Sequence, residues 1–350
     1  MEVIEGEARI DTGGVFYNPR MKFCRDIDVL LAKVLGLKIT FLDSLAATGV
    51  RGIRMALEAG LEVTLNDRGK NAYRVLQRNC EINRLKCNVL NMDANAVYHL
   101  HRFDWVDVDP FGSPVEFLDG AVRCAKMLIS VTATDTAPLC GTYPKACLRK
   151  YDAISYKTDF YPEVGLRILI GKLARTSASR EKGIKVLLSW GREHYFRVHA
   201  KVERGTRKAD ETIQKVGFVF YCRNCGWRTA ISIADDFPEC CECGKKMKRI
   251  GPLWLGELED KEIVDKILKI AKNSGMKEHE SLLTKISGEL NIPFYYDLHF
   301  IGKLLGKSVP STQKVITELR DMGYSATETR FSGTSVKTDT PLESLKSIFS

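Results

Sequence analysis

The chain lacks a long hydrophobic run, since none of its apolar stretches approaches the roughly 18 residues that a membrane-spanning helix needs. Its first residues also lack the charged and apolar segments of a secretory signal peptide. The sequence contains no apparent internal repeat or low-complexity segment. These absences exclude a helical membrane protein and favour a globular protein of the cytoplasm. The length of 350 residues leaves room for two or three domains, one with a large core.

The sequence also lacks the even set of cysteines that a disulfide framework requires. There are 11 cysteines, of which most are scattered through helix-like or strand-like segments, while five lie between Cys222 and Cys243. This distribution indicates reduced thiols together with one metal site. The six histidines show no spacing typical of metal ligands, and we interpret His194 and His199 as ordinary strand positions.

Acidic residues are fewer than basic ones. The chain contains 44 Asp and Glu against 53 Lys and Arg, which gives a formal net charge of +9. Such an excess suits a polyanionic partner, but many soluble proteins are equally basic. Charge alone therefore does not identify a ligand, and no feature of the sequence indicates an obligate protein partner.

The most informative stretch is 105–114, an apolar strand that runs into Asp109 and then turns at once. Pro110 has no N–H and fixes φ, so regular strand pairing should stop there. Phe111 offers a flat aromatic face, and Gly112 permits a conformation that other residues avoid. The stretch predicts a carboxylate, a carbonyl and an aromatic ring at the carboxyl end of a strand, which is the edge where open α/β sheets bind ligands.

An acidic or amide residue followed by proline and an aromatic residue is typical of enzymes that methylate exocyclic amines. Such an amine is a poor nucleophile because its lone pair is delocalised into the ring. Asp109 and the Pro110 carbonyl could accept hydrogen bonds from the amine, and Phe111 could stack on the base. A simple acidic strand end before a turn explains the stretch equally well when it is taken alone.

Strand-like and helix-like segments alternate from residue 39 to residue 132 in the order β-α-β-α-β-β-α-β. Three of these strands end in an acidic residue, and a fourth ends at the Asp109 corner. Parallel strands covered by helices are the simplest arrangement for this pattern. Segments 186–190 and 195–202 are joined by a short polar turn and should complete the sheet as antiparallel strands.

Two segments could hold an anionic or ribose-bearing cofactor. The loop 44–52 follows the first strand and opens a helix, but Ala46 and Thr48 replace glycines of a G-x-G-x-x-G motif. Asp67 ends a strand about twenty residues beyond that loop, where an acid usually binds ribose hydroxyls. Asp67 could alternatively be a helix N-cap. Arg25 could anchor a carboxylate or remain a solvated cation.

A second kind of site is predicted at 222–243. Two C-x2-C pairs separated by 14 residues offer four thiolates for a tetrahedral Zn²⁺, and they are formed by Cys222, Cys225, Cys240 and Cys243. With no open position, the metal should be structural. Cys241 is left over, although it could replace Cys240. The charged segment 203–215 before this site is expected to be a linker.

The C-terminal part is expected to be helical and then mixed. Segments 257–272 and 278–290 have the pattern of amphipathic helices. A helix pair at 297–305 and 312–322, followed by a hairpin within 327–338, outlines a winged helix. Such a module binds nucleic acid or protein, so the outline does not identify a partner.

Several of these stretches resemble the tRNA guanine-26 N2-dimethyltransferases, namely residues 16–21, 47–52, 109–114, 134–141 and 323–338. The resemblance runs nearly end to end and implies an α/β fold of the class I S-adenosylmethionine-dependent, Rossmann-like type. It implies a methyltransferase domain at 1–204 with a short N-terminal arm, and a C-terminal α+β RNA-binding domain at 205–350. The latter would contain the zinc knuckles at 222–243 and a winged-helix-like segment at 257–350.

The resemblance also implies which residues hold the cofactor S-adenosylmethionine. Arg25 and Arg51 should meet its methionine end, and Asp67 should bind the ribose. Asp93 and Ala94 should contact the adenine. These assignments place the cofactor over the acid-ended strands.

The same resemblance implies that Asp109 is the catalytic acid/base residue. Phe16, Pro110 and Phe111 should contact the substrate base. The zinc insert with its four cysteine ligands is present in only part of the family. Its structural role is therefore expected mainly from the spacing of its cysteines.

The function implied is methyl transfer to guanine N2 at position 26 of tRNA, giving N2-methyl- and then N2,N2-dimethylguanosine. The target base lies within the tRNA body and should flip out into the pocket. One alternative is adenine N6 methylation on DNA or RNA, although such enzymes usually carry two prolines before the aromatic residue. Another is a zinc-ribbon and winged-helix regulator that binds nucleic acid without catalysis, which leaves the acid-ended strands unexplained.

Overall fold

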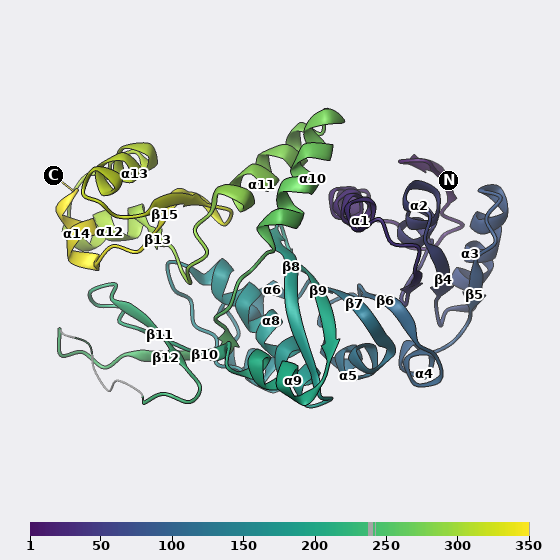
Figure 1. Ribbon diagram of the computed structural model, residues 1–350, viewed down its shortest axis with the longest axis horizontal. Coiled ribbons are helices and arrows are strands. Elements are labelled where there is room, and N and C mark those ends of the chain that lie inside the picture. The colour runs from purple at the N-terminus through teal and green to yellow at the C-terminus, as the bar shows by residue number, and fades with distance from the viewer. Residues whose placement is uncertain (237–240, 242, 350) are drawn as a thin grey trace.

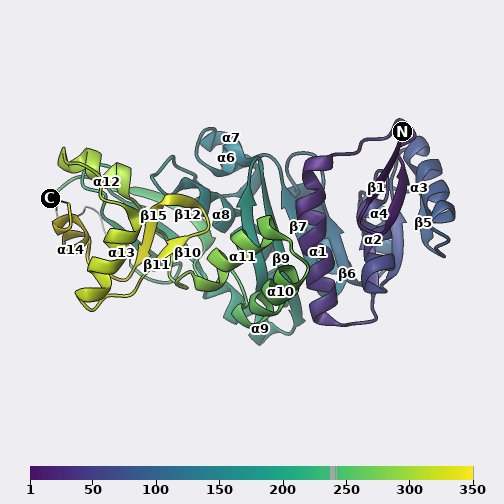
Figure 2. The ribbon, with the colours of Figure 1, turned by 90° about the horizontal axis from the view of Figure 1, so that it is seen from above.

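The structure, a computed structural model, describes residues 1–236, 241 and 243–349. Its centre is a seven-stranded mixed sheet with the strand order β5-β4-β3-β6-β7-β9-β8. The molecule is elongated, and its two termini lie toward opposite ends (Figure 1 and Figure 2). Within the described ranges, no helix combines the length and the hydropathy that crossing a membrane requires.

Five strands of this sheet run parallel, as the alternation of strands and helices predicted. They are β3 (Thr40–Asp43), β4 (Glu62–Asn66), β5 (Asn88–Leu90), β6 (Phe103–Val108) and β7 (Ala125–Ala133). The predicted antiparallel pair is confirmed as β8 (Lys182–Arg192) and β9 (Tyr195–Arg204). All carboxyl ends of the parallel strands therefore meet at one edge of the sheet.

Helices cover both faces of the sheet, because successive strand residues point to opposite sides. In β6, Trp105 belongs to one hydrophobic cluster and Val106 to the other. The Trp105 side is covered by α1 (Lys22–Leu35), α2 (Val50–Ala59) and α3 (Lys70–Ile82). The Val106 side is covered by α4 (Ala94–Leu100), α5 (Val115–Cys124) and α8 (Tyr161–Ala178). Both faces of the parallel strands are thus withdrawn from water.

Short elements surround this core. The first residues, expected to be a short arm, form a hairpin of β1 (Glu2–Glu5) and β2 (Ala8–Asp11). The 3-10 turn η1 (Pro19–Met21) leads into α1. Two short helices follow β7, namely α6 (Thr136–Leu139) and α7 (Pro144–Tyr151).

Two helices correct the predicted element order. The sequence analysis placed two strands in succession before Asp109, but α4 lies between them, capped by the Asp93 side chain and with Val97 and Tyr98 buried. The prediction that 203–215 is a linker is also wrong. Those residues finish β9 and form α9 (Thr206–Ile213), whose Thr212 hydroxyl accepts a hydrogen bond from the Ile184 N–H of β8.

The segments beyond α9 pack against both faces of the methyltransferase-like core. The antiparallel sheet β11-β10-β12 lies against α8 and consists of β10 (Val216–Tyr221), β11 (Arg228–Ser232) and β12 (Lys248–Trp254). The helices α10 (Lys261–Asn273) and α11 (Lys277–Gly288) join the hydrophobic cluster of α1. The division at residue 204 stays a prediction, while the contacts across it belong to the two main hydrophobic clusters.

The helix pair and hairpin predicted for the C-terminal part are confirmed. The helices are α12 (Leu298–Leu305) and α13 (Thr312–Asp321), and the strands are β13 (Tyr296–Asp297), β14 (Ala326–Thr329) and β15 (Ser332–Thr338). The sheet order is β13-β15-β14. The helix α14 (Leu342–Ser347) closes a separate small hydrophobic cluster.

Candidate active site and candidate metal centre

A cavity of about 640 Å³ opens at the carboxyl ends of the parallel strands. Its wall includes every residue predicted for the active site: Phe16, Arg25, Arg51, Asp67, Asp93, Ala94, Asp109, Pro110 and Phe111. A second cavity, of about 680 Å³, lies at the opposite edge, near the first residues of β3, β4 and β6, and contains none of them. The first cavity is therefore the candidate active site.

The loop after β3 forms one wall of the cavity and is tied to the next strand. Gly49 begins α2 with φ +78°, a conformation that favours glycine. The N–H of Ala47 donates to Asp67 at 3.1 Å, and Asp67 also accepts from the N–H of Gly69 at 2.8 Å. Asp67 thus organises the loop while its remaining lone pairs are available to a ligand.

The end of β5 forms the neighbouring wall. Asp93 accepts a hydrogen bond from the N–H of Asn95 at 2.9 Å and so caps α4. Asn91 donates to the Asp67 carbonyl at 2.8 Å, which links the ends of β4 and β5. The two predicted cofactor acids are therefore held side by side by backbone and amide contacts.

Asp109 belongs to a buried network of charges. Its carboxylate pairs with the guanidinium of Arg51, which also contacts Asp28 and lies 3.2 Å from Asp107. Arg197 of β9 contacts Asp107 at 2.6 Å and Asp28 at 3.0 Å. Burial alone would raise the pKa of Asp109, but the charges of Arg51 and Arg197 outweigh it and lower this pKa below its ordinary value.

The network contains more acids than cations, and Asp43 responds to the surplus. Burial and the charge of Asp107 raise the pKa of Asp43 well above its ordinary value. Burial also lowers the pKa of His199 well below its ordinary value, so that this ring stays neutral beside Asp28. The proton of the cluster is thus favoured on Asp43, and Asp109 stays ionised as a hydrogen-bond acceptor.

Arg25 lines the cavity but already has a partner that the sequence did not indicate. Glu5 of the N-terminal hairpin pairs with it through two hydrogen bonds, at 2.7 Å and 2.5 Å. Arg25 also donates to the Asn18 carbonyl at 3.1 Å. Within the described part of the chain its Nη1 group makes no hydrogen bond, which leaves two N–H donors for a ligand carboxylate.

Two aromatic rings border the cavity. Phe16 and Phe111 are 54% and 76% exposed, and their centroids lie 4.6 Å apart at an interplanar angle of 81°. Gly112 makes the turn with φ +82°, and its N–H donates to the Thr134 hydroxyl at 2.7 Å. Large aromatic faces that remain in water beside a cavity are suited to stacking on a flat ligand.

The turn between β8 and β9 also lines the cavity, which the sequence analysis missed. Glu193 and His194 form this turn, and Tyr195 follows it. The interpretation of His194 as a strand position is wrong, whereas His199 does lie in β9. The sequence predicted this short polar turn but not its place in the cavity wall, because that place depends on the strand pairing that brings β9 beside β7.

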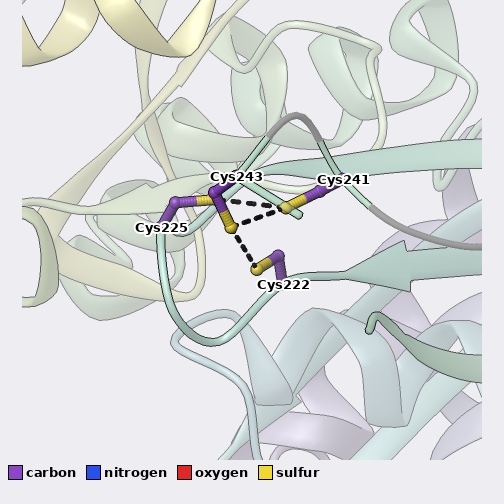
Figure 3. Close-up of side chains that lie close together, drawn as sticks. All are labelled: Cys222, Cys225, Cys241 and Cys243. Atoms are coloured by element: carbon purple, nitrogen blue, oxygen red, sulfur yellow. Dashed lines mark hydrogen bonds between the residues drawn. The ribbon is translucent and has the colours of Figure 1, made fainter. Parts of the chain in front are cut away.

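Four cysteines lie close together at the end of the β11-β10-β12 sheet, as Figure 3 shows: Cys222, Cys225, Cys241 and Cys243. Their sulfur atoms all lie within 4.8 Å of one another, with Cys222 and Cys243 at 3.6 Å and Cys225 and Cys241 at 3.7 Å. Zn–S bonds of about 2.3 Å in a tetrahedron require S···S distances of about 3.8 Å. The 3.6 Å and 3.7 Å distances suit a Zn²⁺ ion, whereas the sulfur atoms of Cys241 and Cys243 lie closer together, at 2.9 Å. Cys240, the third ligand predicted from the spacing, lies outside the described residues.

Comparison with known proteins agrees with the geometry of the cavity. The family model of N2,N2-dimethylguanosine tRNA methyltransferase matches residues 3–350. Two proteins named tRNA (guanine(26)-N(2))-dimethyltransferase are similar over nearly their full length. The one from Archaeoglobus fulgidus is 43% identical, over 97% of this chain and 95% of its own. The one from Pyrococcus horikoshii is 42% identical, over 98% and 96%.

A solved structure is similar throughout. It is described as Trm1 from Pyrococcus horikoshii in complex with S-adenosyl-L-methionine. The superposition has a TM-score of 0.93 at 40% sequence identity and covers 100% of this chain and 99% of the other.

Proposed function

The chain belongs to the N2,N2-dimethylguanosine tRNA methyltransferase family, and from this premise we propose which residues carry its reaction. The protein is an S-adenosylmethionine-dependent tRNA (guanine-N2)-dimethyltransferase. The relatives are named for guanine 26 of tRNA, and we propose the same position here. The observation that carries the proposal is the Asp109 carboxylate, which follows β6 directly, pairs with Arg51 and lies beside two exposed aromatic rings in one cavity.

Asp109 makes the exocyclic amine reactive. Its carboxylate accepts a hydrogen bond from the N2 amine, and the Pro110 carbonyl is positioned on the same corner to accept a second. These bonds draw the nitrogen lone pair out of conjugation with the ring and direct it toward the methyl donor. As the N–C bond forms and the bond between the methyl group and the donor sulfur breaks, leaving a neutral thioether, the amine would lose a proton to Asp109, which would then release it to water.

Arg51 keeps Asp109 in the ionised state that this role requires. A neutral carboxyl group would offer a donor where an acceptor is needed. Because the guanidinium also contacts Asp28 and Asp107, its position is determined from three sides. The first methylation leaves one N–H on the amine, so Asp109 can hold the monomethylated amine for the second transfer.

The cofactor residues fit S-adenosylmethionine, which supplies an electrophilic methyl group on a sulfonium when it is bound. The Arg25 Nη1 donors and Arg51 face its carboxylate end. Asp67 accepts hydrogen bonds from the ribose hydroxyls, and Asp93 with Ala94 contacts the adenine. Support comes from their common position in the cavity wall and from the hydrogen bonds that join Asp67 to the β3 loop.

Phe16 and Phe111 hold the flipped base. Their edge-to-face arrangement leaves ring surface exposed at the cavity. Removing a base from the tRNA stack costs a few kcal/mol, which stacking on aromatic side chains offsets by about 1–3 kcal/mol per base. The partner is therefore a tRNA whose target nucleotide can leave its stack.

The Cys222, Cys225, Cys241 and Cys243 cluster holds one structural zinc ion in this proposal. All four ligands come from the protein, so no position is left for a substrate.

Free thiols elsewhere in the chain and a tRNA substrate favour action in the cytoplasm.

Methylation of unmodified tRNA with labelled cofactor, followed by mapping of the labelled nucleotide, tests the function. We expect N2-methyl- and N2,N2-dimethylguanosine at position 26. Asp109→Ala should lower the rate about 100-fold or more, while calorimetry shows unchanged cofactor binding. Label on adenine N6, or full activity of Asp109→Ala, would contradict the proposal.

A further inference from the structure

The turn of residues 193–194 lies on the substrate side of the active site. The cofactor acids Asp67 and Asp93 follow β4 and β5, which are on one side of β6 in the sheet order. The strands β7, β9 and β8 are on the other side, and Ala133 at the end of β7 pairs with Phe196 of β9. The turn therefore borders the cavity across Asp109 from the cofactor.

This turn is held firmly in place. Arg192 and Tyr195 pair directly across it, so the loop has only two residues. The Arg192 guanidinium lies 3.9 Å from the centroid of the Phe23 ring and pairs with Glu278 of α11. Glu193 adopts φ +49°, which is unfavourable for a residue with a side chain. An acidic residue at the cavity wall thus occupies a costly backbone state.

Glu193 is also a carboxylate of the cavity wall that the proposed contacts with the cofactor do not use. Asp67 and Asp93 accept backbone hydrogen bonds at the cofactor wall, and Glu116 lies in the first turn of α5, which packs on α4. Asp43 also lines the cavity and accepts from the Gly52 N–H at 3.1 Å. Glu193 makes a 3.9 Å ion pair with its neighbour Arg192 and is exposed.

Guanine presents two donors and one acceptor on its Watson–Crick edge, namely the N2 amine, N1–H and O6. Enzymes that flip a base read this edge with hydrogen bonds. Asp109 takes the amine in the proposed function, so N1–H requires a second acceptor and O6 a donor. On the proposed function of this cavity, we propose that Glu193 accepts from guanine N1–H and that His194 donates to O6. The turn thereby selects guanine over purines with an acceptor at N1.

The test uses tRNA carrying 2,6-diaminopurine at position 26. This base keeps the reacting N2 amine but has an acceptor at N1 and an amine in place of O6. We expect wild type to prefer guanine by at least about 100-fold in kcat/KM, since a site built to hydrogen-bond a group rejects analogues that lack it. Glu193→Gln, whose amide can donate to N1, should lower guanine methylation and reduce this preference by about tenfold or more.

Two further variants and one measurement make the result decisive. Glu203→Gln, at the far end of the same hairpin, should keep the wild-type preference. His194→Phe should slow guanine methylation about tenfold without slowing that of diaminopurine. Calorimetry should show wild-type cofactor binding in each variant. An unchanged preference in Glu193→Gln would overturn the inference, whereas a wild type inactive on guanine tRNA would overturn the proposed function instead.

Discussion

The environment of Asp109 has two opposite effects on the pKa of its carboxyl group. Burial favours the neutral carboxyl group, and Arg51 favours the carboxylate. Because Arg51 also contacts Asp28 and Asp107, loss of its charge would leave three carboxylates close together. In the proposed function, Arg51 therefore positions the Asp109 carboxylate and, together with Arg197, favours its ionised state.

The first prediction concerns the pH dependence of methyl transfer. A group whose pKa is lowered is ionised above that pKa, so the wild-type rate should be lost only when the pH falls below the ordinary range of an aspartate. Arg51→Met should move the acidic limb of kcat/KM upward by at least about one pH unit, because Arg197 is then left to balance the carboxylates of the cluster. Arg51→Lys, which keeps the charge, should move it less. An acidic limb at the same pH in all three proteins would contradict the assigned role of Arg51.

Sequence reasoning identified the residues of the site that are close in the chain or regularly spaced. Asp109, Pro110 and Phe111 are contiguous, and Asp67 lies at a recognised distance from the β3 loop. The partners of the arginines were missed, because pairing across the fold leaves no local pattern. Arg197 and Asp28, for example, are 169 residues apart and yet lie 3.0 Å from each other.

At the scale of elements, the strands of the central sheet and the long helices were predicted. The helices α4 and α9 and the strands of the β11-β10-β12 sheet were not. α4 has only seven residues, and its first turn overlaps the acid that the sequence analysis assigned to a strand end. α9 buries only Ala209 and Thr212, so its charged surface reads as a linker. Each helix is stabilised because neighbouring elements cover the narrow side on which its few buried residues lie. This packing depends on the tertiary structure and leaves no pattern in the local sequence.

The contact between α8 and β12 gives a second prediction. A Cβ added at Gly171 would lie 2.9 Å from the Leu253 Cα and 3.0 Å from the Trp254 N, which are backbone atoms that cannot move alone. Gly171→Ala should therefore lower the free energy of unfolding by about 1–3 kcal/mol. Gly288→Ala, in α11 with no atom within 4 Å, should leave it unchanged or raise it by up to about 1 kcal/mol. Denaturant unfolding of both variants measures the difference, and equal effects would show that α8 and β12 are loosely packed.

The third prediction concerns the metal centre. Cys241 lies 3.7 Å from Cys225 and 2.9 Å from Cys243 through their sulfur atoms. Cys241→Ser should therefore release zinc and lower Tm, whereas Cys240→Ser should keep about one zinc per chain. Elemental analysis after dialysis against a weak chelator measures the content. Zinc loss in Cys240→Ser alone would restore the regular C-x2-C pair as the ligand set.

At the scale of the whole molecule, buried ions join the C-terminal hairpin to the core. Arg330 pairs with Glu289 at 2.5 Å and with Glu259, and it also donates to the Ser189 carbonyl of β8 at 3.0 Å. Lys337 of β15 pairs with Glu289 at 2.9 Å and with Glu163 of α8 at 3.2 Å. Because these side chains are buried, the C-terminal part is fixed to the core by charge pairs rather than by apolar packing alone.

Removing Arg330 from this network should be costly, since Glu259 loses its pair with Arg330 and Glu289 keeps only the one with Lys337 among its two pairs. The charges of Arg330 and Lys337 outweigh the effect of burial and lower the pKa of Glu289 to about 2. Arg330→Met should therefore destabilise the protein by about 3–5 kcal/mol at pH 7. Lys314→Met, which breaks an exposed pair with Glu318, should cost no more than about 0.5 kcal/mol.

The pH dependence of the same variant separates charge from packing. The wild-type contribution of Glu289 is fully present above about pH 4.5, the ordinary pKa for a glutamate, and is lost as the pH falls toward about 2. The difference in unfolding free energy between wild type and Arg330→Met should therefore shrink in acid, where Glu289 becomes protonated in the variant. A difference that is constant from pH 7 to pH 3 would mean that the arginine acts through its apolar contacts. In that case the position of the C-terminal part would be set by packing, and the buried ions would only accompany it.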